Sequence, residues 1–198
     1  MKTPFLYIPL LCLSMLFNAC GNRKHEKETD SVALAKSENK TRFADTGFYD
    51  EENFAVTAAE AHLMQINAGN LCKTNASLDT LLKFGRTLVE NHTLIHDQLA
   101  GWAKSNKVIL PVTLTPDNKK KYKDLSEMQS RNFENKFTEL IIYDQEQLLD
   151  NYRKEAERGK DTVLKAWARE KIMTMETDLQ TANWIKAELA KPPLKNKN

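Results

Sequence analysis

The sequence predicts an all-α protein in which four long antiparallel helices enclose one core. Apolar residues recur at intervals of three, four and seven, no stretch alternates as a strand does, and no internal repeat is evident. The clearest stretch is residues 77–106, where three adjacent columns at heptad spacing form one wide face. The columns are Leu78, Gly85, His92 and Leu99; Leu81, Leu88, Ile95 and Trp102; and Leu82, Val89, His96 and Ala103. Because His92 and His96 lie one turn apart within this face, we expect any chemistry of the protein near them.

The first twenty residues have the layout of a secretory signal that ends in a cysteine. Lys2 precedes an apolar run at residues 4–17, shorter than the roughly 20 residues that span a bilayer, and Ala19 and Cys20 follow. The arrangement resembles a bacterial lipoprotein signal, in which residues 1–19 are removed and Cys20 carries palmitate and other acyl chains. An uncleaved anchor or an ordinary secretory signal is the alternative. Since Gly21 rather than aspartate follows the cysteine, the resemblance implies an outer-membrane lipoprotein of the cell envelope, facing the periplasm or the surface.

The charge balance gives no support for a nucleic-acid partner, and the cysteines leave no pair for a disulfide within the mature chain. The chain has 29 basic and 27 acidic residues, and loss of Lys2 with the signal leaves a formal charge of +1. This balance, with no basic stripe interleaved with aromatic residues, gives no steering toward nucleic acid. Cys72 is then the only free thiol, and we expect it to be a core residue on an apolar stripe. An intermolecular disulfide or a redox role is the alternative.

The segment after Cys20 is predicted to be a flexible tether. Residues 21–48 are rich in Lys, Glu, Asn, Ser and Thr and contain few large apolar residues. Such a segment buries too little surface to offset the entropy of ordering. We therefore expect a lipidated tether at residues 20–48, a folded domain at residues 49–190 and a basic tail at residues 191–198.

The first helix of the domain is expected at residues 50–72, with three acidic residues at its positive N-terminal end. Its inward stripe consists mainly of small residues and contains Gln65, with His62 on its flank one turn earlier. Asn75 and Ser77 mark the turn that follows, and Ser77 is expected to cap the next helix.

Two prolines define the connection after residue 106. Pro111 and Pro116 rule out a continuous helix through KVILPVTLTPDN, so this segment should be an extended crossover. Thr115 followed by Pro116 is typical of a helix start, which predicts a short helix within the crossover.

The last two long helices are expected at residues 132–158 and 162–190. Gln145 lies in the apolar stripe of the former and Asp178 at the edge of the stripe of the latter. Gly159 suits a C-cap and Asp161 an N-cap between them. Together these elements predict a ferritin-like antiparallel four-helix bundle with a short extra helix in the crossover.

Several segments together resemble an uncharacterised ferritin-like domain of bacterial periplasmic and putative outer-membrane proteins. They are NFAVTAAEAHLMQINAG, LLKFGRTLVENHTLIHDQLAGWA, the ILP crossover, NFENKFTELIIYDQEQLL and the closing helix, which span residues 53–189. The resemblance implies inward metal ligands: a glutamate, an Asp-His pair and two further histidines. This sequence has Gln65, Asn91 with His92, Gln145 and Asp178 at those positions, so His92 alone is retained and the implied metal site is degenerate.

Physical reasoning about the same residues leads to two alternatives. Amides are poor ligands for transition metals, and no histidine has a carboxylate three residues before it, as a ferritin-type site needs. The neutral groups Gln65, Asn91, Gln145 and His92 should then form a hydrogen-bonded layer, in which His92 is neutral and bonds chiefly to Gln65 and Gln145. The alternative is iron or zinc bound by His62, His92 and His96, with His62 level with His96 on antiparallel helices.

Two classes of function follow from these observations. The first is a non-enzymatic envelope lipoprotein that uses its lipid to attach to the membrane and binds an envelope protein or responds to stress. The second is a metal-binding or redox protein of the ferritin-like kind. We expect no catalytic residues, because the inward stripes contain neither a nucleophile–base pair on adjacent turns nor paired acids.

Overall fold

Every element of secondary structure in the described part of the chain is a helix, which confirms the all-α prediction. The computed structural model describes residues 30–44, 46 and 48–191. In chain order the helices are α1 (Ser31–Phe43), α2 (Tyr49–Asn75), α3 (Asp79–Ser105), α4 (Pro116–Ser126), α5 (Ser130–Arg158) and α6 (Thr162–Leu189). None of these helices is both long and apolar enough to cross a membrane.

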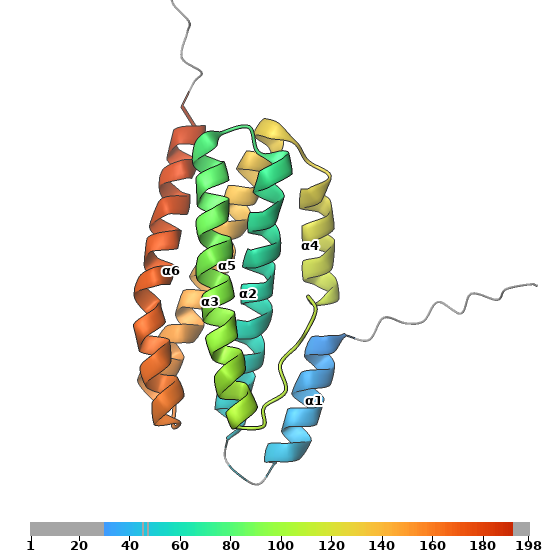
Figure 1. The fold of residues 1–198 in the computed structure, drawn as a ribbon, viewed down its shortest axis with the longest axis vertical. Helices are drawn as coiled ribbons and strands as arrows, with labels where there is room; N and C mark the ends of the chain where they lie inside the picture. The colour runs from blue at the N-terminus through green and yellow to red at the C-terminus, as the bar shows by residue number, and fades with distance from the viewer. Residues whose placement is uncertain (1–29, 45, 47, 192–198) are drawn as a thin grey trace, which may run out of the picture.

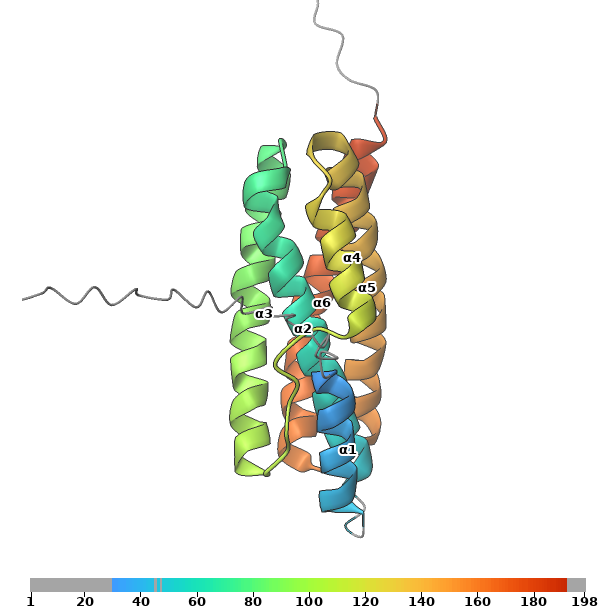
Figure 2. The ribbon, with the colours of Figure 1, turned by 90° about the vertical axis from the view of Figure 1, so that its right-hand side faces the viewer.

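Four long helices, α2, α3, α5 and α6, run side by side along the long axis of the molecule (Figure 1). Helix α2 packs mainly on α3 and α5 mainly on α6, and contacts of α2 with α5 and of α3 with α6 join these two pairs. Figure 2 shows α1 and α4 on the same side of the molecule, one beyond the other along its length. Residues 107–115 run between the end of α3 and α4 as the extended crossover that the two prolines predict.

Three of the predicted helix ends are confirmed, and one is wrong. Thr115 accepts a hydrogen bond from the backbone N–H of Asn118 at 3.2 Å, and Asp161 accepts one from Leu164 at 2.6 Å. Gly159 follows α5 as its C-cap. Ser77 is not the N-cap of α3, because Leu78 occupies that position. The apolar side chain of Leu78 makes no capping hydrogen bond.

A buried glutamate from α5 takes the place of the expected Ser77 cap. Glu134 is 1 % exposed, and its Oε1 accepts the backbone N–H groups of Ser77 and Leu78 at 2.9 and 3.0 Å. The same oxygen accepts the Ser77 hydroxyl at 2.7 Å. A negative charge at a helix N-terminus is stabilised by the helix dipole, so Glu134 both caps α3 and joins it to α5.

The structure differs from the expected tether over residues 31–43, which form α1. Asp30 caps this helix by accepting the N–H groups of Val32 and Ala33, and Val32, Ala35 and Asn39 are buried. Asn39 makes two 2.8 Å bonds to the crossover, donating to the carbonyl of Ile109 and accepting its N–H. The amide of Asn39 thus pairs both backbone polar groups of Ile109, as a neighbouring β-strand would. The composition of a segment does not reveal this kind of contact.

Apolar side chains fill the interior as two clusters, one toward each end of the long helices. The lower apolar cluster lies near the starts of α2 and α6, and the upper apolar cluster lies near the starts of α3 and α5, as oriented in Figure 1. A polar level lies between the two clusters. Leu88, at the centre of the predicted face, is fully buried, whereas Leu78 is 39 % exposed. The observed inward residues of α3 are Leu81, Phe84, Gly85, Leu88, His92, Ile95, Leu99 and Ala103.

Helices α2 and α3 approach most closely at two glycines. A Cβ on Gly69 would lie 2.8 Å from the carbonyl oxygen of Gly85, and a Cβ on Gly85 would lie 2.6 Å from the Cβ of Cys72. Only glycine at both positions permits this contact. Cys72 lies in the contact as a buried core residue, as expected, and burial raises the pKa of its thiol to about 12.

Candidate functional site

The polar level between the two apolar clusters contains a hydrogen-bonded group of side chains from all four long helices. We call it the buried network, and its members are His62 of α2, His92 and Asn91 of α3, Gln145 and Tyr152 of α5, and Asp178 of α6. Except for Asn91, which is partly buried, each member is at most 1 % exposed. Polar groups so deeply buried are tolerated when they are paired, so the network constrains how the four helices fit together.

The two histidine rings form the centre of the network. His62 Nδ1 lies 2.7 Å from His92 Nδ1, and His62 Nε2 lies 2.7 Å from the hydroxyl oxygen of Tyr152. On the other side, His92 Nε2 lies 2.9 Å from Gln145 Nε2 and 3.6 Å from Asp178 Oδ2. All four ring nitrogens therefore have partners inside the network.

The series of hydrogen bonds from Gln145 through the two histidines to Tyr152 can run in either of two directions. In the first, Gln145 Nε2 donates to His92 Nε2, His92 Nδ1 donates to His62 Nδ1, and His62 Nε2 donates to Tyr152. In the second, Tyr152 donates to His62 Nε2, His62 Nδ1 donates to His92 Nδ1, and His92 Nε2 faces Asp178. Turning the Gln145 amide over completes the second direction, because its Oε1 has no partner in the first.

Asp178 connects the network to a surface hollow between α3 and α6. The amide of Asn91 donates to both carboxylate oxygens of Asp178, at 3.2 and 3.3 Å. Both residues line a hollow of about 540 Å³ whose walls include the side chains of Thr87 and Thr177. The Asp178 end of the network thus borders this hollow, while the Tyr152 end lies in the lower apolar cluster.

Burial keeps His62 and Tyr152 neutral, and like charge adds to this effect at His62. Burial lowers the pKa of His62 well below its ordinary value, and the neighbouring rings of His92 and His96 lower it further. Burial also raises the pKa of the Tyr152 hydroxyl well above its ordinary value. At neutral pH, Tyr152 is therefore a phenol and His62 a neutral imidazole.

Two of the predicted site residues lie outside the bonded chain. Gln65 is fully buried, yet neither of its amide atoms has a hydrogen-bond partner, so the expected bond from Gln65 to His92 is wrong. His62 occupies that position instead. His96 is partly buried, its Nε2 has no partner, and its Nδ1 lies 3.9 Å from Asp97. Cys20, the predicted lipidation site, lies outside the described residues.

Tyr152 is the network member that sequence reasoning did not assign to the site. It is one of the buried residues of α5. Its position seven residues after Gln145 places both on one face of α5, and a buried tyrosine usually needs a hydrogen-bond partner. Those two facts together could have identified it.

The geometry of the network does not fit a metal ion. Two nitrogens bound to one tetrahedral zinc are about 3.3 Å apart, because each lies about 2.0–2.1 Å from the metal. The facing Nδ1 atoms of His62 and His92 are closer, at 2.7 Å, which is a hydrogen-bond distance. Among the described residues, no group of three or more His, Cys, Asp or Glu side chains could hold a metal ion.

Fold and site together define a protein whose described residues form only helices and whose long helices enclose a buried histidine–tyrosine–amide network. The chain belongs to the DUF4142 family, a domain of unknown function, whose match covers residues 32–185. The matched segment begins inside α1, so it includes part of the segment expected to be a tether. The comparison with curated proteins and the comparison with solved structures gave no match.

Proposed function

We propose that this protein is an outer-membrane lipoprotein of the cell envelope whose helical domain binds an envelope partner, in a stress-related or structural role, without catalysing a reaction. Residues 1–19 act as the signal peptide, and Cys20 carries the acyl chains. The support is the basic residue, the short apolar run and the Ala19-Cys20 pair described above. Several acyl chains on one residue anchor stably, since each buried methylene contributes about 0.8 kcal/mol.

We further propose that the domain is a ferritin-like antiparallel four-helix bundle with α4 in its crossover. The side-by-side arrangement of α2, α3, α5 and α6 supports this class (Figure 1), as does the long connection between the α2–α3 pair and the α5–α6 pair. Helix α1 is an addition to that plan, packed on α2.

One observation carries the non-enzymatic, metal-free proposal: the 2.7 Å contact between His62 Nδ1 and His92 Nδ1. Groups that would be ligands in a ferritin-type centre bond to each other and to Tyr152 and Gln145. The protein therefore uses its polar centre to hold the helices in register, and the site is degenerate with respect to metal.

Metal content tests this part of the proposal. The full chain, purified without chelator and without an affinity tag, should contain well under one iron or zinc per chain. Near-stoichiometric metal that disappears in His92→Ala would overturn it.

Cell fractionation tests the anchor. Cys20→Ala should be released from membranes or remain unprocessed, whereas Cys12→Ala, which changes a cysteine inside the signal, should behave as the natural protein does. Normal processing and unchanged fractionation of Cys20→Ala would remove the lipoprotein proposal. A separate experiment identifies the partner: proteins of the envelope are crosslinked, the envelope is solubilised, and the protein is captured together with whatever is attached to it.

A metal-handling role is the second candidate, and one observation favours it. His96 lies close enough to His62 to lower the pKa of that ring, and His96 Nε2 is buried without a partner. If the rings of His62, His92 and His96 separated, they could offer nitrogen ligands to zinc or iron. The metal analysis above distinguishes this candidate from the first.

A further inference from the structure

We propose that Tyr152 is a redox-active tyrosine, oxidised through Trp167 by a small one-electron oxidant, with His62 as the acceptor of its proton. This activity goes beyond the proposed binding function and needs no metal. It is inferred from the path that the side chains offer to an electron and from the path that they offer to a proton.

The electron path begins in a surface hollow between the end of α3 and the start of α6. Two indoles, those of Trp102 and Trp167, line this hollow of about 420 Å³. The partly buried ring of Trp167 lies against Tyr152, with 5.5 Å between the ring centroids and 43° between the ring planes. Electron transfer slows steeply with distance, so this contact makes Tyr152 the natural electron donor to an oxidised Trp167.

The proton path begins at the Tyr152 hydroxyl. Oxidation of a phenol makes it strongly acidic, so the electron leaves at a lower energy cost when a base takes the proton at the same time. His62 Nε2 is 2.7 Å away, at the distance of a positioned general base, and it accepts in the second direction of the network. Because the buried His62 ring is neutral, its Nε2 atom is free to take this proton.

The network can pass the proton from His62 to His92. When His62 Nε2 gains a proton, His62 Nδ1 can release its own to His92 Nδ1, 2.7 Å away. The relay ends at His92, whose Nε2 lies 3.6 Å from Asp178 Oδ2, beside the hollow between α3 and α6. The electron thus leaves through one hollow between α3 and α6, and the proton moves toward the other.

The reaction balances as follows. The oxidant takes one electron from Trp167, which becomes a radical cation. Trp167 recovers an electron from Tyr152, whose O–H bond breaks, and the proton passes to His62 Nε2. The products are the reduced oxidant, neutral Trp167, a neutral tyrosyl radical at residue 152 and one proton, which the two histidines hold beside the Asp178 side chain.

The surroundings of Tyr152 suit a long-lived radical. Its side chain is fully buried, with Phe54 edge-on at 5.0 Å and the lower apolar cluster around it. Exposed Tyr143, in contrast, is 57 % accessible on the same helix and would lose a radical quickly to solutes. It therefore serves as the matched control.

Pulse radiolysis of the full chain in detergent tests the proposal, with azide radicals as the oxidant. Transient absorption should show a tryptophanyl radical that decays into a long-lived tyrosyl radical. The long-lived signal should be lost in Tyr152→Phe and unchanged in Tyr143→Phe. A Tyr152→Phe protein that keeps the natural tyrosyl signal, or a Tyr143→Phe protein that loses it, would overturn the proposal.

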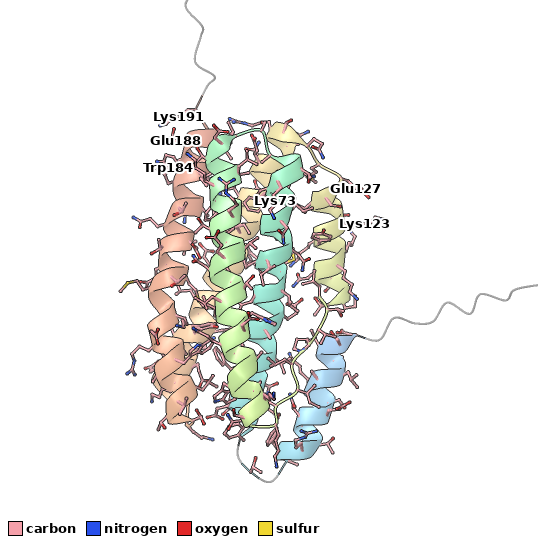
Figure 3. All side chains as sticks on the ribbon, viewed as in Figure 1. Lys73, Lys123, Glu127, Trp184, Glu188 and Lys191 are labelled. Carbon is pink, nitrogen blue, oxygen red and sulfur yellow. The ribbon has the colours of Figure 1, made fainter. Side chains whose placement is uncertain are left out.

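Two further comparisons test the separate paths. Trp167→Phe should lower the yield of the tyrosyl radical, whereas Trp184→Phe should not. Trp184 is 52 % exposed and labelled near the upper end of α6 in Figure 3, about 25 Å along the helix from Trp167. Equal yields in the two variants would remove Trp167 from the path.

The role of His62 is tested by His62→Gln, which can accept a hydrogen bond but cannot take a proton. We expect the transfer from tryptophan to tyrosine to slow about 10²-fold, the lower end of what a positioned general base contributes. If this variant does not fold, as judged by circular dichroism, the natural protein decides the question in heavy water. Transfer should be slower there because an O–H bond breaks, and identical rates in light and heavy water would overturn the assigned proton step.

Discussion

Glu155, at the end of α5, offers a stability test whose sign depends on pH. This carboxyl is 5 % exposed, and its Oε1 has no hydrogen-bond partner. Burial, followed by the negative charges of Glu51, Asp161 and Asp50, raises its pKa from 4.5 to about 7, against a smaller opposing effect of Lys165. Glu51 cannot move away, because its Oε1 accepts the backbone N–H groups of Lys160 and Asp161.

The sign follows from the protons bound in each state. Between pH 4.5 and 7 the folded protein keeps Glu155 protonated while the unfolded chain ionises it, so stability falls as pH rises through this window. Above about pH 7 the loss is complete. The shift corresponds to about 3 kcal/mol at most, and screening at the hollow that Glu155 lines reduces this to about 1–2 kcal/mol.

The perturbation is Glu155→Gln, which keeps the shape of the side chain and removes its charge. Urea unfolding should show the variant about 1–2 kcal/mol more stable than the natural protein at pH 8 and nearly equal to it at pH 4.5. Glu146→Gln, on an exposed position of the same helix, is the control and should show no such difference. Equal effects of Glu155→Gln at both pH values would refute the reasoning.

Three further substitutions test the packing and the pairing of buried groups by urea unfolding at pH 7. Leu88→Ala should cost about 2–5 kcal/mol, because it opens a cavity in the upper apolar cluster; a change under about 0.5 kcal/mol would contradict its burial. Gln65→Leu should stabilise the fold by about 1–3 kcal/mol, because it removes a buried amide without partners, and a clear loss of stability would show that the amide is paired. Glu134→Ala should cost about 1–3 kcal/mol, because it leaves the first N–H groups of α3 unpaired, whereas exposed Glu139→Ala should change little.

Periodicity was sufficient to predict the long helices and the inward position of Leu88 and His92. A repeat of three, four and seven residues depends only on the chain itself, so it survives whatever the neighbouring helices do. The caps at Thr115 and Asp161 were predictable for the same reason, since donor and acceptor are three residues apart.

Partners on different helices were harder to predict. His62 was expected level with His96, but it bonds to His92, one turn away. A displacement of one turn is about 5.4 Å along a helix and is set by packing such as the Gly69–Gly85 contact. The same limit explains why Gln65, rather than His62, was assigned as the partner of His92.

Helix α1 escaped prediction for a different reason. It contributes only three buried residues, and one of them is Asn39, whose value lies in its two bonds to the backbone of Ile109. A polar residue that stabilises a distant segment leaves no periodic signal. The composition of residues 21–48 therefore indicated a tether where the chain has a helix.

Helix α1 also limits the orientation of the domain if Cys20 carries a lipid. Residues 21–29 then connect the acylated residue to Asp30, which caps the start of α1. The greatest distance that this connection can span is roughly 30 Å. The connection meets the domain at the start of α1, near the middle of the domain's length and on the side where α4 lies (Figure 1). With that anchor in place, a connection of this length would keep the start of α1, and with it the lysine-rich α4 on the same side, within reach of the lipid headgroups, while the hollows between α3 and α6 would remain open to other molecules.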